Sequence, residues 1–149
     1  MRFLIILLYF FLNHSFAHEY EKNGILITHP VLKMVANDGK MGAGYFKIKN
    51  NSDNEIQLIG IDSNIAKKQE IHEVVEENGV YKMRPLKEDL IVLPGKELIF
   101  KSKSYHIMFF GINKSHVNDE MLDAKINFKN NVINIKFKVL IGNQEHKHH

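Results

Sequence analysis

Two histidines and two methionines lie near the middle of the 149-residue sequence, at spacings that suit β-strands. His72 and Met83 lie on either side of Glu76-Glu77-Asn78-Gly79, which separates two strand-like runs and is typical of a β-hairpin. A four-residue loop would place His72 opposite Met83, whereas a two-residue turn at Asn78-Gly79 would make them diagonal neighbours. Both registers put the two side chains on one face of the hairpin.

A second pair of possible ligands, His106 and Met108, lies in the apolar run 105–110. A strand there would place the imidazole and the thioether on one face, so four donors converge if the two segments are neighbours. Thioether sulfur is a soft, neutral donor and imidazole is intermediate, which together suit Cu(I) better than zinc or hard cations. Because the sequence has no Cys, it lacks the thiolate of a blue-copper centre. The pattern therefore predicts a protein that carries copper and does not use it for electron transfer.

A packing role for the same four residues is the alternative. Methionine fills gaps in many cores, and a histidine on a strand is more often structural than a ligand. The protein would then be an exported β-sandwich adhesion or scaffold domain without metal, and it would bind no stoichiometric copper. No arrangement of Ser, His and Asp matches a nucleophile elbow or a catalytic triad, so we do not expect an enzyme.

The run His72-x10-Met83-x22-His106-x-Met108 resembles the signature of the periplasmic PCuAC-type copper chaperones. The similarity extends over about residues 24–140 and includes Ala43-Gly44-Tyr45-Phe46, Asn50, Ile71-His72-Glu73, Lys82-Met83-Arg84-Pro85 and Leu93-Pro94-Gly95. One departure precedes His106, where Lys101-Ser102-Lys103-Ser104 replaces the usual Pro/Gly-rich turn.

The resemblance implies a cupredoxin-like Greek-key β-sandwich and an exported Cu(I)-binding metallochaperone. Its implied copper ligands are His72, Met83, His106 and Met108. It also implies delivery of copper toward cytochrome oxidase assembly, with an oxidase copper subunit or a thiol-bearing assembly factor as partner. Copper storage or detoxification by the same site stays open.

Residues 1–17 have the organisation of a Sec signal peptide. A short positive segment, Met1-Arg2, precedes an apolar stretch and the small-x-small site Ser15-Phe16-Ala17. The apolar stretch is too short to span a bilayer comfortably, and the sequence has no Cys to carry a lipid. We therefore predict cleavage before His18, a periplasmic protein, and no stable membrane insertion after signal removal. Loss of Arg2 lowers the formal net charge from +3 to +2, and no basic stripe for nucleic acid emerges.

The remaining sequence predicts one domain, residues 18–140, of eight or nine short strands that form an all-β sandwich. The residues alone do not separate a cupredoxin-like from an immunoglobulin-like sandwich. Residues 122–129 and 132–140 predict a hairpin across Asn130-Asn131, and residues 90–93 and 97–101 predict another around Pro94-Gly95. Residues 105–112, apolar on both faces, predict a buried central strand.

The other histidines and methionines have weaker patterns. Residues 141–149 form a His-rich tail in which His146, His148 and His149 could hold Cu(II), with a solvated chain end as the alternative. We expect surface positions for His29 and His116. Met34 and Met121 are expected in the core or at its rim, and Met41 in a loop that covers the site.

Overall fold

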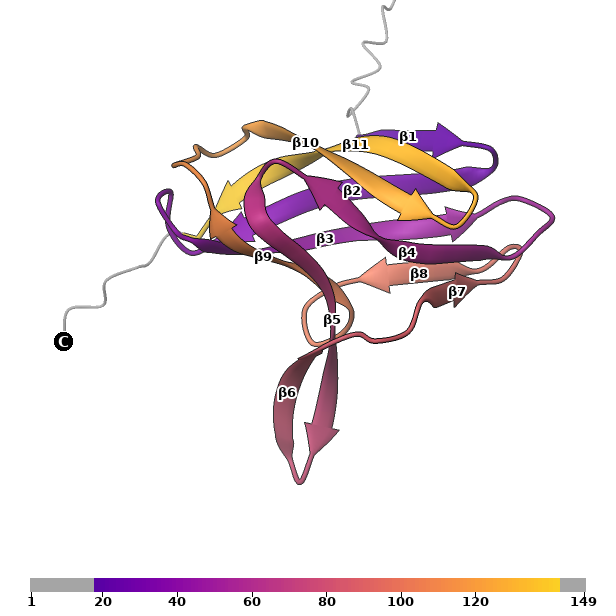
Figure 1. Ribbon diagram of the computed structural model, residues 1–149, viewed down its shortest axis with the longest axis horizontal. Coiled ribbons are helices and arrows are strands. Elements are labelled where there is room, and N and C mark those ends of the chain that lie inside the picture. Colours follow the sequence, from indigo (N-terminus) through magenta and orange to yellow (C-terminus); the bar gives the residue numbers. More distant parts are fainter. Residues whose placement is uncertain (1–17, 143–149) are drawn as a thin grey trace, which may run out of the picture.

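A computed structural model describes residues 18–142 and contains eleven β-strands in that range (Figure 1). In chain order these are β1 (Glu19–Lys22), β2 (Ile25–Met34), β3 (Met41–Asn50), β4 (Ile56–Ser63), β5 (Ala66–Glu77), β6 (Val80–Pro85), β7 (Leu90–Val92), β8 (Glu97–Phe100), β9 (His106–Ile112), β10 (Met121–Phe128) and β11 (Asn131–Ile141). Within these residues no helix is long and apolar enough to cross a membrane.

The strands form one hydrogen-bonded sheet in the order β6-β5-β9-β3-β2-β11-β10-β4-β7, with β1 added to β2 and β8 to β3. The pairing of β11 with β2 is parallel and the other pairings are antiparallel, so the sheet is mixed. The sheet folds over on itself, so that side chains from separate strands meet in the core. The ring centroid of Phe137 in β11 is 6.1 Å from that of Phe46 in β3 and 5.6 Å from that of Phe109 in β9. The predicted all-β domain is confirmed.

The hairpin of β10 and β11 supplies one wall of the core. Its inward side chains are those expected from the alternating pattern, and each is at most 4% exposed: Ile126, Phe128, Ile133, Ile135, Phe137 and Val139. Burying an aliphatic or aromatic side chain of this size contributes about 1.5–3 kcal/mol. Phe128 pairs with Asn131, so the turn consists of residues 129 and 130, one position earlier than predicted.

The N-terminal strand β1 was not expected from its polar sequence. It pairs with β2 through a turn in which Asn23 and Gly24 have φ of 53° and 75°, values that favour a tight hairpin. Residues 31–34 of β2 pair with β11, which leaves the edge of residues 25–28 free for β1. His29 and Pro30 form a bulge within a continuous β2, and His29 is exposed as expected.

The predicted hairpin of residues 90–93 and 97–101 is wrong. Strand β7 pairs with β4, whereas β8 pairs with β3. The fully buried Asn50 holds this region together, because its Nδ2 donates to the carbonyls of Val92 and Asn54, both at 2.8 Å. Its backbone carbonyl also accepts a hydrogen bond from the N–H of Gly95 at 2.7 Å. Asn50 is therefore a structural residue, and the Pro94-Gly95 turn joins two distant parts of the sheet.

Strand β3 begins at Met41, earlier than the glycine-rich sequence suggests. Gly44 lies on its core face, where a Cβ would come within 2.9 Å of the Phe109 ring and 3.2 Å of the Ile107 side chain. Glycine thus allows β3 and β9 to pack tightly over the core.

Candidate metal centre

The outer face of strands β3, β9, β5 and β6 carries the predicted donors. Strand β9 is central as expected, lying between β5 and β3, but only one of its faces belongs to the core. Ile107 and Phe109 are buried beneath it, while His106, Met108 and Phe110 point to the opposite side. The side chains of residues 105–112 therefore divide between the core, on one face of β9, and the outer surface of the sheet, on the other.

The pairing of β5 with β9 brings the two histidines together. His72 is paired directly with His106, and Glu70 with Met108. The two imidazole ring centroids are 5.9 Å apart. Opposite residues of an antiparallel pair share a face, so both imidazoles and the Met108 thioether lie on the same surface.

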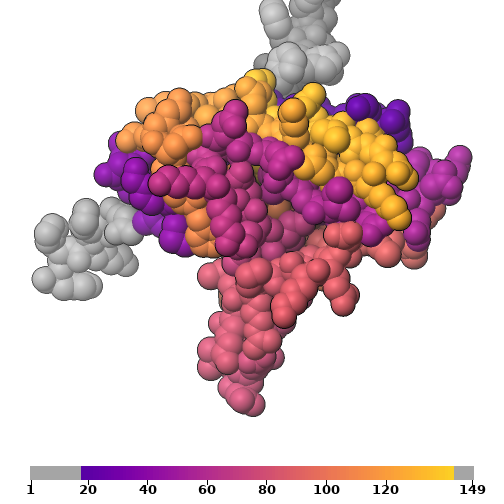
Figure 2. Space-filling model, viewed as in Figure 1, coloured from indigo at the N-terminus to yellow at the C-terminus, as the bar shows by residue number. Residues whose placement is uncertain are grey.

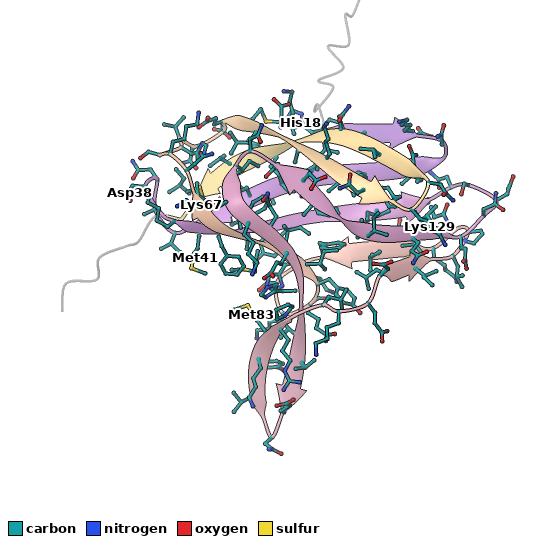
Figure 3. The ribbon with its side chains drawn as sticks, in the orientation of Figure 1. His18, Asp38, Met41, Lys67, Met83 and Lys129 are labelled. Carbon is teal, nitrogen blue, oxygen red and sulfur yellow. The ribbon has the colours of Figure 1, made fainter. Side chains whose placement is uncertain are left out.

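The β5–β6 hairpin adds Met83 to this face. Its turn is the two-residue Asn78-Gly79, with φ of 53° and 76°, which selects the diagonal register of the two predicted. Val74 pairs with Met83, and His72 pairs with Pro85. Met83 is 62% exposed and lies at the base of the projecting hairpin (Figure 3). The structure thus places all four predicted donors on one face, on three adjacent strands.

Of the two imidazole nitrogens of His106, Nδ1 forms a hydrogen bond and Nε2 does not. The residue is 3% exposed, and its Nδ1–H donates to the carbonyl oxygen of Ser104 at 3.0 Å. A carbonyl only accepts, so Nδ1 carries the proton and Nε2 carries a lone pair. Nε2 is buried without a hydrogen-bond partner in the described structure. Ser104 belongs to the segment that departs from the family sequence, and it supplies this contact through its backbone.

His72 has the opposite tautomer for a similar reason. It is 8% exposed, and its Nε2 lies 3.1 Å from the Glu70 carboxylate. Hydrogen bonds from Lys68 and from His72 hold the pKa of Glu70 below its usual range, so the carboxylate is ionised and accepts. Nδ1 of His72 therefore has the lone pair, and it is buried without a partner in the described structure.

Buried polar atoms in proteins are nearly always hydrogen-bonded, so two free imidazole nitrogens on adjacent strands require an explanation. A ligating histidine commonly donates its other ring N–H to a carboxylate or a backbone carbonyl, as His72 and His106 do here. In the part of the chain from 18 to 142, no three His, Asp or Glu side chains are arranged to hold a metal ion. A metal on this face would therefore depend on the thioethers as well, and such a donor set suits Cu(I).

Aromatic rings surround the two imidazoles. The Tyr45 ring centroid is 6.4 Å from that of His106, and the Phe110 ring centroid is 5.8 Å from that of His72. The Tyr45 side chain is partly buried, and burial raises the pKa of its hydroxyl. Partial exclusion of water strengthens the bonds that the imidazoles can make.

His116 is buried, contrary to expectation. It was expected on the surface, but it is only 2% exposed, with its Nδ1 3.0 Å from the Glu120 carboxylate and its backbone N–H bonded to the Asn37 carbonyl. Its polar neighbours in sequence gave no sign that the loop folds back onto the domain. Its Nε2 is also buried without a hydrogen-bond partner among the described residues, but His116 lies in the loop between β9 and β10, outside the four-strand face.

The remaining methionines have distinct environments. Met34 is a core residue at 3% exposed, and Met121 is half-buried. Met41 is 52% exposed and is the first residue of β3, not part of a loop as expected. The signal peptide prediction and the tail histidines His146, His148 and His149 fall outside the described residues.

The profile of a family described as "Putative lipoprotein LpqE-like" matches residues 25–139. The chain belongs to the LpqE-like family. A search of curated proteins gives no match to this LpqE-like chain.

Solved structures similar to the LpqE-like chain are PCuAC domains and a related protein. The copper-bound PCuAC domain from PmoF2 has a TM-score of 0.68 at 18% identity and covers 84% of this chain and 99% of that one. The apo PCuAC domain from PmoF1 has a TM-score of 0.70 at 17% identity and covers 84% and 100%. The Cu(I) form of DR1885 from Deinococcus radiodurans has a TM-score of 0.59 at 18% identity and covers 84% and 80%. The PCuAC resemblance and the cupredoxin-like fold are confirmed.

Proposed function

We propose that this LpqE-like protein is a Cu(I) metallochaperone whose ligands are His72, Met83, His106 and Met108. The observation that supports it best is the pair of buried imidazole nitrogens without partners, Nδ1 of His72 and Nε2 of His106. Each is backed by an oxygen that fixes its tautomer, and the same face presents two thioethers. Two solved structures of the same fold, the PCuAC domain from PmoF2 and DR1885, are copper-bound, which supports a copper-carrying role for this chain.

Each group has a distinct part in holding copper. The two histidines are buried in the body of the sheet and provide the fixed donors. The Glu70 carboxylate, behind His72, offsets part of the positive charge of a bound Cu(I). Met83, at 62% exposed, is the donor that an incoming ligand reaches most easily. Release by exchange of a neutral thioether involves no proton transfer and no change in oxidation state.

Copper binding is tested by competition between the protein and a chromophoric Cu(I) chelator under anaerobic conditions. We expect one tightly bound Cu(I) per main site and a large loss of affinity in His72→Ala and in His106→Ala. His116→Ala is the matched control, because His116 is also buried and also pairs with a carboxylate, yet it is outside the donor face. Unchanged Cu(I) binding in both site variants would favour a scaffold or adhesion domain without metal.

The proposed cellular role is delivery of copper in the periplasm toward oxidase copper-site assembly. Cu(I)-loaded protein should transfer its metal to a purified apo oxidase copper subunit, or to a thiol-bearing assembly factor, when the two are mixed. If copper remains with the chaperone and recipients gain none, storage or detoxification is the better account.

Export and domain organisation are part of the same proposal. Residues 1–17 would be removed as a signal peptide, leaving the copper domain, residues 18–140, and a His-rich tail, residues 141–149. The mass of the protein from a periplasmic fraction tests this, with His18 expected as the first residue. A mass that includes residues 1–17 would argue for a tethered protein.

The tail is proposed as a separate Cu(II) site built from His146, His148 and His149. Imidazoles bind Cu(II) well, whereas the thioethers of the main site favour Cu(I). Deleting residues 145–149 should lower the Cu(II) stoichiometry and leave Cu(I) affinity unchanged. A simultaneous fall in Cu(I) affinity would contradict the independence of the two sites.

A further inference from the structure

A groove of about 820 Å³ lies beside the donor face and is lined mainly by apolar side chains. It runs between the ends of β2, β3 and β11, and Met108 forms part of its wall; other residues that line it are Met34, Val35, Met41, Tyr45 and Ile141. One of the proposed copper ligands, Met108, therefore lines the groove, whereas His72 and His106 do not. Three of its lining residues are methionines.

Met41 is positioned to extend the set of soft donors into this groove. In the pairing of β3 with β9, Ala43 is opposite Met108 and Met41 is opposite Phe110. Met41 and Met108 are thus diagonal neighbours on the same face, with Cα atoms about 7–8 Å apart for such pairs in general. Methionine has three rotatable side-chain bonds, so two thioethers at this separation can approach a common ion.

The exposure of Met41 argues against a packing role. Met41 is 52% exposed, whereas Met34, in the same groove, is 3% exposed and belongs to the core. A methionine that fills a gap in a core should be buried as Met34 is. Figure 3 shows Met41 and Met83 on the same side of the molecule, with Met83 at the base of the hairpin.

Four neighbouring strands then each contribute a soft or intermediate donor to one face. In sheet order these are β6 with Met83, β5 with His72, β9 with His106 and Met108, and β3 with Met41. The two histidines are at the centre of this series and are buried, while the thioethers at its two ends are more than half exposed.

We propose that Met41 and Met108 form a second, weaker Cu(I) site that shares Met108 with the main site and lies at the mouth of the groove. The inference rests on the proposed copper function and adds a second position for the ion. Copper moves between the positions when the bonds to His72, His106 and Met83 break and one to Met41 forms, while the bond to Met108 is kept. The ion stays Cu(I), all the exchanging donors are neutral, and no proton is released.

Two thioethers bind Cu(I) less tightly than a set that includes two imidazoles, because fewer and only soft, weakly basic donors are present. The second site therefore fills after the main site, and it lowers the barrier for copper to enter or leave along the groove. Met83, at the opposite end of the donor series, releases the ion in this step and takes no part in the second site.

The test follows methionine methyl groups by NMR in the full mature chain, labelled with 13C at the methionine methyl carbon. The mature chain has five methionines, so five signals are expected, and Met→Leu variants assign them. Cu(I) is added anaerobically in steps to three equivalents. The first equivalent should shift the signals of Met83 and Met108, and a later one should shift Met41 and move Met108 again. Met34 and Met121 should stay in place.

Met41→Leu is the decisive variant, since it keeps the side-chain volume and is expected to fold normally. It should abolish the later shift of Met108, leave the first binding event intact, and slow the transfer of Cu(I) to a chelator. Met34→Leu, a change in the same groove, should do none of these. A Met41 signal that stays fixed through three equivalents overturns the second site. Fixed signals of Met83 and Met108 at the first equivalent would instead overturn the main copper site.

Discussion

The hairpins β5–β6 and β10–β11 resemble each other in local structure and differ in what their side chains contact. Each has a two-residue turn and strands of alternating character. The inward residues of β10 and β11 fill the core, whereas all six residues of β6 are exposed. Figure 2 shows β5–β6 projecting from the body of the molecule. Similar local rules thus produce one hairpin that stabilises the fold and one that presents Met83, a proposed ligand.

Strand β5 belongs both to the body of the sheet and to the projecting hairpin. Its residues 66–72 pair with β9 inside the sheet, and residues 73–77 pair only with β6. His72 is the residue at which these pairings meet. The projecting part is held by backbone pairing and by exposed ion pairs of Glu77 with Lys82 and Arg84, and the hydrogen bond from Lys82 lowers the pKa of Glu77. Exposed ion pairs contribute little, so the hairpin owes its form mainly to its backbone and turn.

The largest effect is expected in the hairpin that fills the core. Phe137→Ala removes a fully buried ring of β11 and should lower the free energy of unfolding by about 3–5 kcal/mol. Denaturant titration of the apo protein measures this. Tyr81→Ala in β6, where the ring is 57% exposed, should change stability by less than about 0.5 kcal/mol. Similar losses in the two variants would remove the distinction between the hairpins.

The next largest effect is expected on Cu(I) affinity, with little change in the stability of the apo protein. Replacing Met83 and Met108 together by Leu keeps side-chain volume, so apo stability should fall by less than about 1.5 kcal/mol. The affinity for Cu(I) should fall at least about 100-fold, equivalent to about 2.7 kcal/mol, because two of four donors are lost. Chelator competition measures it, with Met34→Leu and Met121→Leu as controls. A double variant that holds Cu(I) as tightly as the parent protein would show that the thioethers only pack.

A smaller effect is expected from the carboxylate behind His72. Glu70→Gln keeps a hydrogen-bond acceptor 3.1 Å from Nε2 but removes its charge, so Cu(I) affinity should fall about tenfold. The matched control is Glu73→Gln, on the same strand but on its other face, where Glu73 pairs with Arg84. Equal effects of the two changes would point to net charge as the cause, and not to the contact with His72.

The smallest effect is expected at the turn of the projecting hairpin. Gly79 has φ of 76° with open space around it, so Gly79→Ala costs only the backbone strain, about 1 kcal/mol. The loss should appear mainly as faster amide hydrogen exchange in β6, and Cu(I) affinity should fall only slightly. Faster exchange across β10 and β11 as well would mean that the two hairpins unfold together.

The sequence predicted much of the fold and pointed to the four residues that we propose as copper donors. Alternation with period two is a property of each strand by itself, so it correctly gave the buried face of β10 and β11 and the shared face of His106 and Met108. The Asn78-Gly79 turn was one of the two loops that the sequence allowed, since these residues tolerate positive φ. These features depend only on residues close together in the chain.

The tertiary structure decided which strands are neighbours and in which register. His72 and His106 are separated by 33 intervening residues, and their direct pairing results from the packing of the whole sheet. The same packing separates β7 from β8, buries His116 in a polar loop, and brings the Ser104 carbonyl and the Glu70 carboxylate to the imidazole nitrogens. Sequence alone therefore determined which donors are available, because local chemistry sets them. Their tautomers and their convergence depend on long-range contacts, which no local pattern encodes.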